Sequence, residues 1–91
     1  MFARKATTTE VMILVSTCEK IDQMLTTFID LVFKERLGHL APMAQKMADD
    51  FRPGWNNIQA GINCNQHFKK KEVTEAMAMC AAINQCIQEA I

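Results

Sequence analysis

Residues 7–38 read TTTEVMILVSTCEKIDQMLTTFIDLVFKERLG, and the spacing of the apolar residues in this stretch decides the fold. Thr7 and Glu10 stand three residues apart, as in a capping box at the start of a helix. Apolar residues then recur at alternating intervals of three and four, which places them on one stripe of a helix. Gly38 is expected to supply a left-handed C-cap. We therefore predict a helix over about residues 8–37, whose stripe consists of Val11, Leu14, Cys18, Ile21, Leu25, Phe28 and Val32.

The remaining residues predict three shorter helices. Pro42 suits the first turn of a second helix, and the RPG sequence at 52–54 is expected to end or kink it. A third helix follows to about residue 68, and a fourth begins after the lysines at 69–71. The apolar residues expected inside these helices are Met43, Met47, Phe51, Trp55, Ile58, Ile62, Val73, Met77, Cys80, Ile83 and Ile87. These patterns predict an all-α fold: a small bundle of about four helices in a single domain, residues 1–91, with 1–7 as a flexible N-terminus.

The composition limits the classes of function. The chain has 91 residues, with ten Lys and Arg against ten Asp and Glu, so its formal net charge is zero. Because proteins that bind nucleic acids or anionic membranes usually carry a basic excess, this balance disfavours both. The apolar run at 11–15 is too short for a secretory signal, and no stretch is long enough to span a membrane. We therefore expect a cytoplasmic protein without membrane contact.

The cysteines raise the questions of disulfides and metal binding. Without an export signal, we expect the four thiols to be reduced and mostly buried, with a disulfide as the second alternative. Cys64 and His67 lie three residues apart, a spacing that can hold zinc together with Cys80 and Cys86. However, Cys80 and Cys86 would point about 240° apart on a helix, so they cannot both face one site. We expect free cysteines, no metal and no cofactor.

The residues that could support catalysis are few and scattered. Ser16, the only serine, lies inside the first predicted helix and has no nucleophile-elbow sequence around it. Asp49 and Asp50 are adjacent, so their side chains would diverge by about 100° on a helix. His39 follows Gly38 and is expected in a loop near a helix C-terminus. The sequence therefore predicts a protein that is not an enzyme.

The first helix carries more apolar surface than one stripe requires. Five of the six residues at 28–33 are apolar, and Met12, Ile13 and Met24 also lie off the main stripe. A helix that is apolar on several faces is either central in its own domain or shared with another chain. The alternatives are a homodimer or partner-binding face on this helix, which we favour, and a central helix covered by its own domain.

Residues 43–67 also fit the outline of a DNA-binding helix-turn-helix, with the turn at 52–54. The second helix of that motif would present Asn56, Asn57, Gln59 and Asn63, and such amides can bind adenine bidentately. Three features count against this alternative. The turn carries Arg52, Pro53 and Gly54, where such motifs more often place a single glycine at the start. No Lys, Arg, Ser or Thr lies between Trp55 and Phe68, and Asp49 and Asp50 would face the phosphates. DNA binding, as a dimer, therefore remains the alternative that we do not favour.

The function that this pattern favours is a protein–protein interaction module, most simply a small regulator or inhibitor that binds and occludes a macromolecular partner. Small inhibitors encoded by phages and other mobile elements are of this general type. Exposed aromatic and basic side chains often dominate binding energy. We therefore expect the partner to contact Trp55, Phe33, Lys69, Lys70 and Lys71. For Trp55 the competing interpretation is a core residue that packs between helices.

Overall fold

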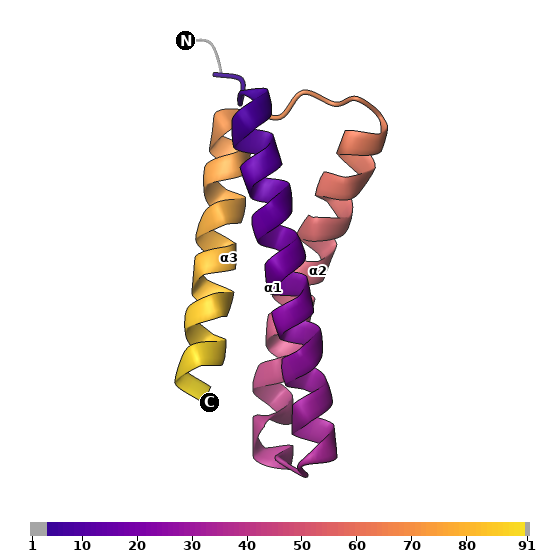
Figure 1. Ribbon diagram of the computed structural model, residues 1–91, viewed down its shortest axis with the longest axis vertical. Helices are drawn as coiled ribbons and strands as arrows, with labels where there is room; N and C mark the ends of the chain where they lie inside the picture. The colour runs from indigo at the N-terminus through magenta and orange to yellow at the C-terminus, as the bar shows by residue number, and fades with distance from the viewer. Residues whose placement is uncertain (1–3, 91) are drawn as a thin grey trace.

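The computed structural model describes residues 4–90, which form a bundle of three α-helices (Figure 1). Helix α1 spans Thr8–Lys34, α2 spans Ala41–Asn63 and α3 spans Lys70–Ala90, and a short 3₁₀ helix, η1, lies at Gly38–Leu40. The bundle is elongated, with extents of 49 × 24 × 18 Å. The predicted all-α class is confirmed, but the described residues contain three α-helices and not four.

Helix α1 begins as the sequence predicts and ends earlier. The Thr7 hydroxyl accepts a hydrogen bond from the backbone N–H of Glu10, and the Glu10 carboxylate accepts one from the N–H of Thr7. These two bonds form the predicted capping box. The expected cap at Gly38 is wrong: Arg36 adopts the left-handed conformation, with φ of 55°. The Leu37 N–H then bonds to the Val32 carbonyl at 2.9 Å and closes the helix end.

The core lies along the predicted stripe of α1. The six stripe positions from Leu14 to Val32 are buried, and they pack against apolar residues of α2 and α3. Val11 and Met77 are half-buried, while Met43, expected inside the second helix, is exposed. In α2 two small residues one turn apart, Ala44 and Ala48, are also buried. Small side chains at this spacing allow two helix axes to approach closely.

Helix α2 is one continuous helix, which corrects the prediction of two. Pro53 lies in its interior, and the helix continues through 52–54 without a turn. A proline removes one backbone hydrogen bond, but it does not by itself end a helix when the residues before and after it are buried in the core. The second half of α2 does change direction in space: it leans away from α1, whereas the first half lies against it (Figure 1).

The connection between α2 and α3 lies at 64–69, inside the segment that was predicted to be helical. Asn65 takes the left-handed conformation, with φ of 56°, and Phe68 from this connection is buried in the core. The connection also pairs with the N-terminal segment. The Ala6 N–H donates to the Phe68 carbonyl, and the Lys70 N–H donates to the Arg4 carbonyl, both at 2.8 Å. Arg4 and Ala6, within the segment 1–7 that was expected to be flexible, thus form backbone hydrogen bonds to this part of the chain; residues 1–3 lie outside the described part.

Candidate partner-binding site

An apolar groove runs along the first half of α1, and its other wall is formed by Ile62 at the end of α2 and by residues 65–68 of the connection. It has a volume of about 640 Å³ and is lined by Val11, Val15 and Phe68 together with the exposed side chains of Met12 and Ile62. Met12 is 66% exposed and Ile62 is 37% exposed. Several large apolar side chains are therefore exposed to solvent in one concave region of the surface. We call this surface the α1/α2 groove.

The groove exists because the two halves of α2 pack differently. In the first half, Ala44, Met47, Ala48 and Phe51 are all buried against the core. After Pro53 only Trp55 and Gly61 are buried, and the apolar stripe continues to Ile62 without a neighbouring helix to cover it. On the buried face of α2 the large Trp55 follows the small Ala48. The axes of α1 and α2 are therefore no longer held close together. The second half of α2 therefore diverges and leaves the groove open.

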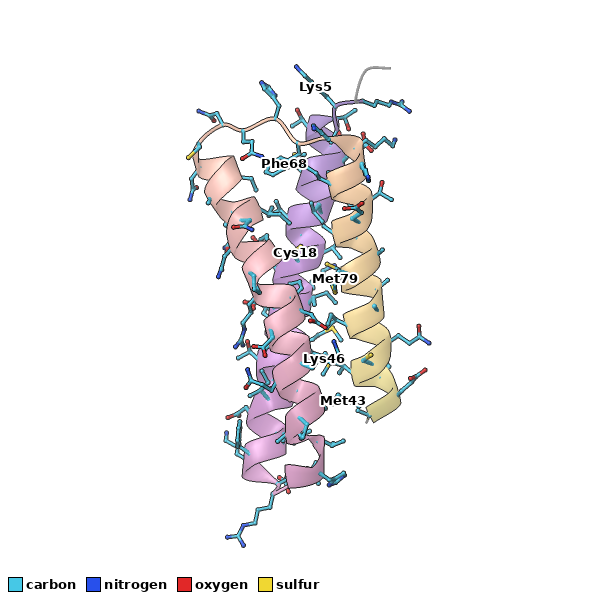
Figure 2. All side chains as sticks on the ribbon, turned by 180° about the vertical axis from the view of Figure 1, so that it is seen from behind. Lys5, Cys18, Met43, Lys46, Phe68 and Met79 are labelled. Carbon is cyan, nitrogen blue, oxygen red and sulfur yellow. The ribbon has the colours of Figure 1, made fainter. Side chains whose placement is uncertain are left out.

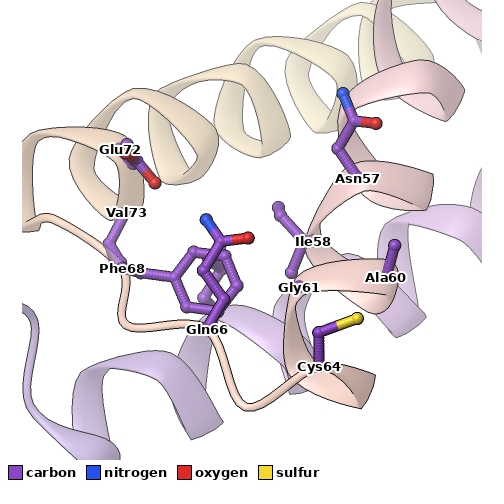
Figure 3. Close-up of a pocket in the computed structure, with 10 residues that line it drawn as sticks. Asn57, Ile58, Ala60, Gly61, Cys64, Gln66, Phe68, Glu72 and Val73 are labelled. Carbon is purple, nitrogen blue, oxygen red and sulfur yellow. The ribbon is translucent and has the colours of Figure 1, made fainter.

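Phe68 fills the space inside the diverging end of the bundle. Its ring points from the connection toward Gly61 and Ile58 of α2, as Figure 3 shows. A Cβ atom placed on Gly61 would lie 2.8 Å from Cζ of Phe68 and 2.9 Å from Oε1 of Gln66. Gly61 is therefore required for the ring to lie against the helix. On the side toward α3, a second hollow of about 400 Å³ lies beside this ring.

One end of the bundle is strongly basic. The antiparallel bridge between Lys5 and Lys69 brings residues 4–5 next to 69–71, so five of the ten Lys and Arg residues gather there. Lys5 projects from this end in Figure 2. Helices α1 and α3 also begin here, and helix N-termini carry partial positive charge. This cluster, Arg4, Lys5, Lys69, Lys70 and Lys71, is the basic end of the bundle.

Acidic side chains neutralise part of the basic end. The Glu10 carboxylate lies 3.2 Å from the Lys70 ammonium, and the backbone N–H of Thr7 followed by Lys70 lowers the pKa of Glu10. Lys71 lies 4.0 Å from Glu75, on the exposed surface of α3. Lys70 and Lys71 thus belong to the first turn of α3, which was expected to begin only after these lysines. Arg4, Lys5 and Lys69 form no ion pair within the described residues.

The structure separates the residues predicted to contact a partner. Phe33 is 71% exposed and lies near the end of α1 that is distant from the basic end. Trp55 is only 7% exposed and belongs to the core, in agreement with the competing interpretation of this residue as an anchor between helices. The lysines at 69–71 gather at the basic end. No single surface therefore brings Phe33, Trp55 and the lysines together.

The amides of the helix-turn-helix alternative lie on α2. Asn56, Gln59 and Asn63 follow one another at intervals of three and four residues on an exposed face, and Asn57 faces the hollows toward α3. Since α2 continues through 52–54, the two helices that this motif requires are a single helix here. The interpretation of residues 43–67 as a helix-turn-helix is therefore wrong, and DNA binding loses the structural feature on which it depended.

The cysteines divide into a buried pair and two exposed thiols. Cys18 of α1 and Cys80 of α3 are buried with their sulfur atoms 3.6 Å apart, whereas Cys64 and Cys86 are exposed, which corrects the expectation of mostly buried thiols. Burial, followed by the hydrogen bond to Cys80, raises the pKa of Cys18 to about 12. Within residues 4–90, no three His, Cys, Asp or Glu side chains are grouped closely enough to hold a metal ion.

Sequence reasoning missed the principal residues of the groove. Ile62 was expected to continue the core, and Phe68 to end a helix, because the divergence of α2 depends on packing between segments distant in the chain. The off-stripe position of Met12 was the one local feature that pointed to this surface. Ile13, predicted with it, is exposed as well, while Met24 is half-buried.

The comparisons with known proteins add no family or relative to this description. Neither the protein-family models, nor the curated proteins, nor the solved structures that were compared include a match to this chain. Among residues 4–90, no helix has the length and apolar character needed to cross a membrane. Geometry and chemistry of the described surface are therefore the basis for the function proposed below.

Proposed function

We propose that this protein is a non-enzymatic interaction module, a small cytoplasmic regulator or inhibitor that binds a protein partner through the α1/α2 groove. The observation that carries the proposal is the open apolar groove itself. Burying a large apolar side chain contributes about 1.5–3 kcal/mol relative to leaving it in water. A partner that covers Met12 and Ile62 would therefore gain binding energy that the free protein leaves unused.

The shape and charge of the groove favour an amphipathic helix as the bound segment. A helix laid along the groove, over Phe68, would place apolar residues on Val11, Val15 and Ile62. The groove opens beside the basic end, where Arg4, Lys5 and Lys69 are exposed. Acidic residues at the matching end of the partner helix would pair with these cations and set its direction.

Binding in this groove leads directly to occlusion. A partner helix held between α1 and α2 has its apolar face covered, so the same face is not free to contact anything else. The exposed Phe33 lies near the opposite end of α1 and offers a second, smaller contact. A second copy of this chain is a possible partner as well, in which case the groove would mediate a homodimer.

Site-specific photo-crosslinking in the cells that express the protein tests this proposal. A benzoylphenylalanine at Met12 lies at the rim of the groove, and the matched control carries it at Met79, an exposed methionine of α3. We expect a discrete cross-linked species from position 12 only. A species of twice the mass of the chain would identify the partner as a second copy.

The captured partner then allows a quantitative test. Met12→Glu introduces a charge that must be desolvated in the complex, and we expect it to weaken binding at least about tenfold. Circular dichroism of this variant should match that of the wild type, because the Met12 side chain is exposed. Equal cross-linking from both positions, or unchanged affinity of the Met12→Glu variant, would contradict the proposal.

A further inference from the structure

The buried thiols of Cys18 and Cys80 lie in contact although they are 62 residues apart in the sequence. One belongs to the middle of α1 and the other to the middle of α3, and they are 1% and 2% exposed. Their sulfur atoms are 3.6 Å apart, so an approach of about 1.5 Å would reach the length of a disulfide bond. Rotation about the side-chain bonds of the two cysteines changes the distance between their sulfur atoms.

The exposed thiols have no comparable neighbour. Cys64 follows the end of α2, at the end of the bundle where α3 begins, whereas Cys86 lies sixteen residues into α3. At 1.5 Å per residue this places Cys86 roughly 24 Å further along the axis. Cys80 and Cys86 are themselves separated by six residues on one helix and point about 240° apart. Of the four cysteines, only the buried pair is arranged for an internal bond.

We propose that Cys18 and Cys80 are the site of an intramolecular disulfide that links α1 to α3 when the protein meets an oxidised low-molecular-weight disulfide such as oxidised glutathione. One protein thiolate attacks a glutathione sulfur, forms a mixed disulfide and releases one glutathione thiolate. The second protein thiolate attacks the protein-side sulfur and releases the other. The two protein protons end on the two glutathione thiols, and glutathione gains the two electrons that the cysteines lose.

The folded protein controls how this reaction begins. Because the thiolate is the nucleophile, the raised pKa of Cys18 and Cys80 slows attack in the closed state. Cys18 lies at the floor of a hollow of about 440 Å³ between α2 and α3, so a transient outward movement of α2 is the shortest route for the oxidant. Once formed, the bond crosses only α1 and α3 and leaves the α1/α2 groove unobstructed. This inference is therefore independent of the proposed function.

Oxidation of a Cys64→Ser/Cys86→Ser variant tests the proposal, because the two remaining thiols are the buried pair. The variant is unfolded in urea and refolded with excess oxidised glutathione, and its intact mass is measured. We expect the loss of two hydrogen atoms, no glutathione adduct, and a single cross-linked peptide that contains both cysteines. We also expect the Tm to rise by about 10 °C or more, and this rise to disappear with reductant, because closing a long loop lowers the conformational entropy of the unfolded chain.

A matched control uses Cys80→Ala in the same background. It should form no internal cross-link, and its Tm should not depend on reductant. Three results would overturn the proposal: glutathione attached to both Cys18 and Cys80, disulfide-linked dimers in place of the internal bond, or an internal bond whose formation leaves the Tm unchanged or lower.

Discussion

The interface of α1 with α3 and that of α1 with the second half of α2 differ, although both begin from the same apolar stripe. Along α3, Val73, Cys80, Ile83 and Ile87 are buried one after another at helical spacing. Along α2 burial continues after Pro53 with Trp55 and Gly61, but Ile58 is only half-buried and Ile62 at the end is exposed. A regular stripe therefore describes what a helix can bury, and the neighbouring helices decide how much of it is buried.

This difference assigns separate roles to the two sides of α1. The side toward α3 is closely packed with small and medium side chains, and the cysteine pair is buried there. The side toward the end of α2 is filled by one ring from a connection, Phe68, and otherwise remains open as the groove. The predictions below test whether this division is real.

Phe68→Ala should have the largest effect. Removing a buried aromatic ring leaves a cavity, so we expect a loss of about 3–4 kcal/mol in the free energy of unfolding, measured by urea denaturation. Phe33→Ala is the matched control, because the same atoms are removed from a ring that is 71% exposed; its effect should stay within about 0.5 kcal/mol. Similar losses in the two variants would mean that Phe68 does not fill the diverging end.

The same substitution at two glycines of α2 should change the free energy of unfolding in opposite directions. Gly54→Ala places its methyl group in open space and should stabilise the protein by about 0.5–1 kcal/mol, because alanine favours the helix. Gly61→Ala places the methyl group against the Phe68 ring and should destabilise the protein by about 1–2 kcal/mol. Thermal and urea unfolding measure both. If Gly61→Ala were as stabilising as Gly54→Ala, the ring would not lie where the structure has it.

The last prediction concerns pH and the interface of α1 with α3. The pKa of Cys18 is raised from 9.0 to about 12, so its proton is held more tightly in the folded chain than in the unfolded one. The stability that this provides is fully present below pH 9.0 and is lost as pH rises toward about 12. Unfolding measured across this range should show a steeper decline for the wild type than for Cys18→Ala. Cys64→Ser, which changes an exposed thiol, should decline like the wild type, and identical slopes in all three would contradict the burial of Cys18.

The sequence predicted those parts of the fold that depend on local spacing. The capping box of Thr7 and Glu10, the stripe of α1 and the apolar face of α3 follow from residues close together in the chain. The helix count was wrong because Pro53 and Gly54 are helix breakers in isolation, whereas burial of Phe51 and Trp55 on either side keeps α2 continuous. Prediction of the groove would have required the direction in which α2 leans, and this direction depends on contacts between the small residues of α2 and α1.

The same distinction, between local spacing and contacts of distant segments, applies to the site residues. The surplus apolar character of α1 identified Met12 and Ile13 as surface residues, which is a local property of one helix. Trp55 was named as a contact residue because aromatic residues often dominate interfaces, with a core position between helices as the competing interpretation, and its burial agrees with the latter. The basic end could be seen only in part, since the lysines at 69–71 are adjacent while Arg4 and Lys5 reach them through backbone pairing.

Residue-resolved native-state hydrogen exchange along α2 is the most direct test of the central claim, that the second half of this helix diverges and leaves an apolar groove. We expect strong amide protection from Ala44 to Phe51, comparable with that of α1 and α3, and markedly weaker protection from Ile58 to Asn63. Uniform protection along the whole of α2 would contradict this claim, because a second half packed as firmly as the first would leave no open surface for a partner helix.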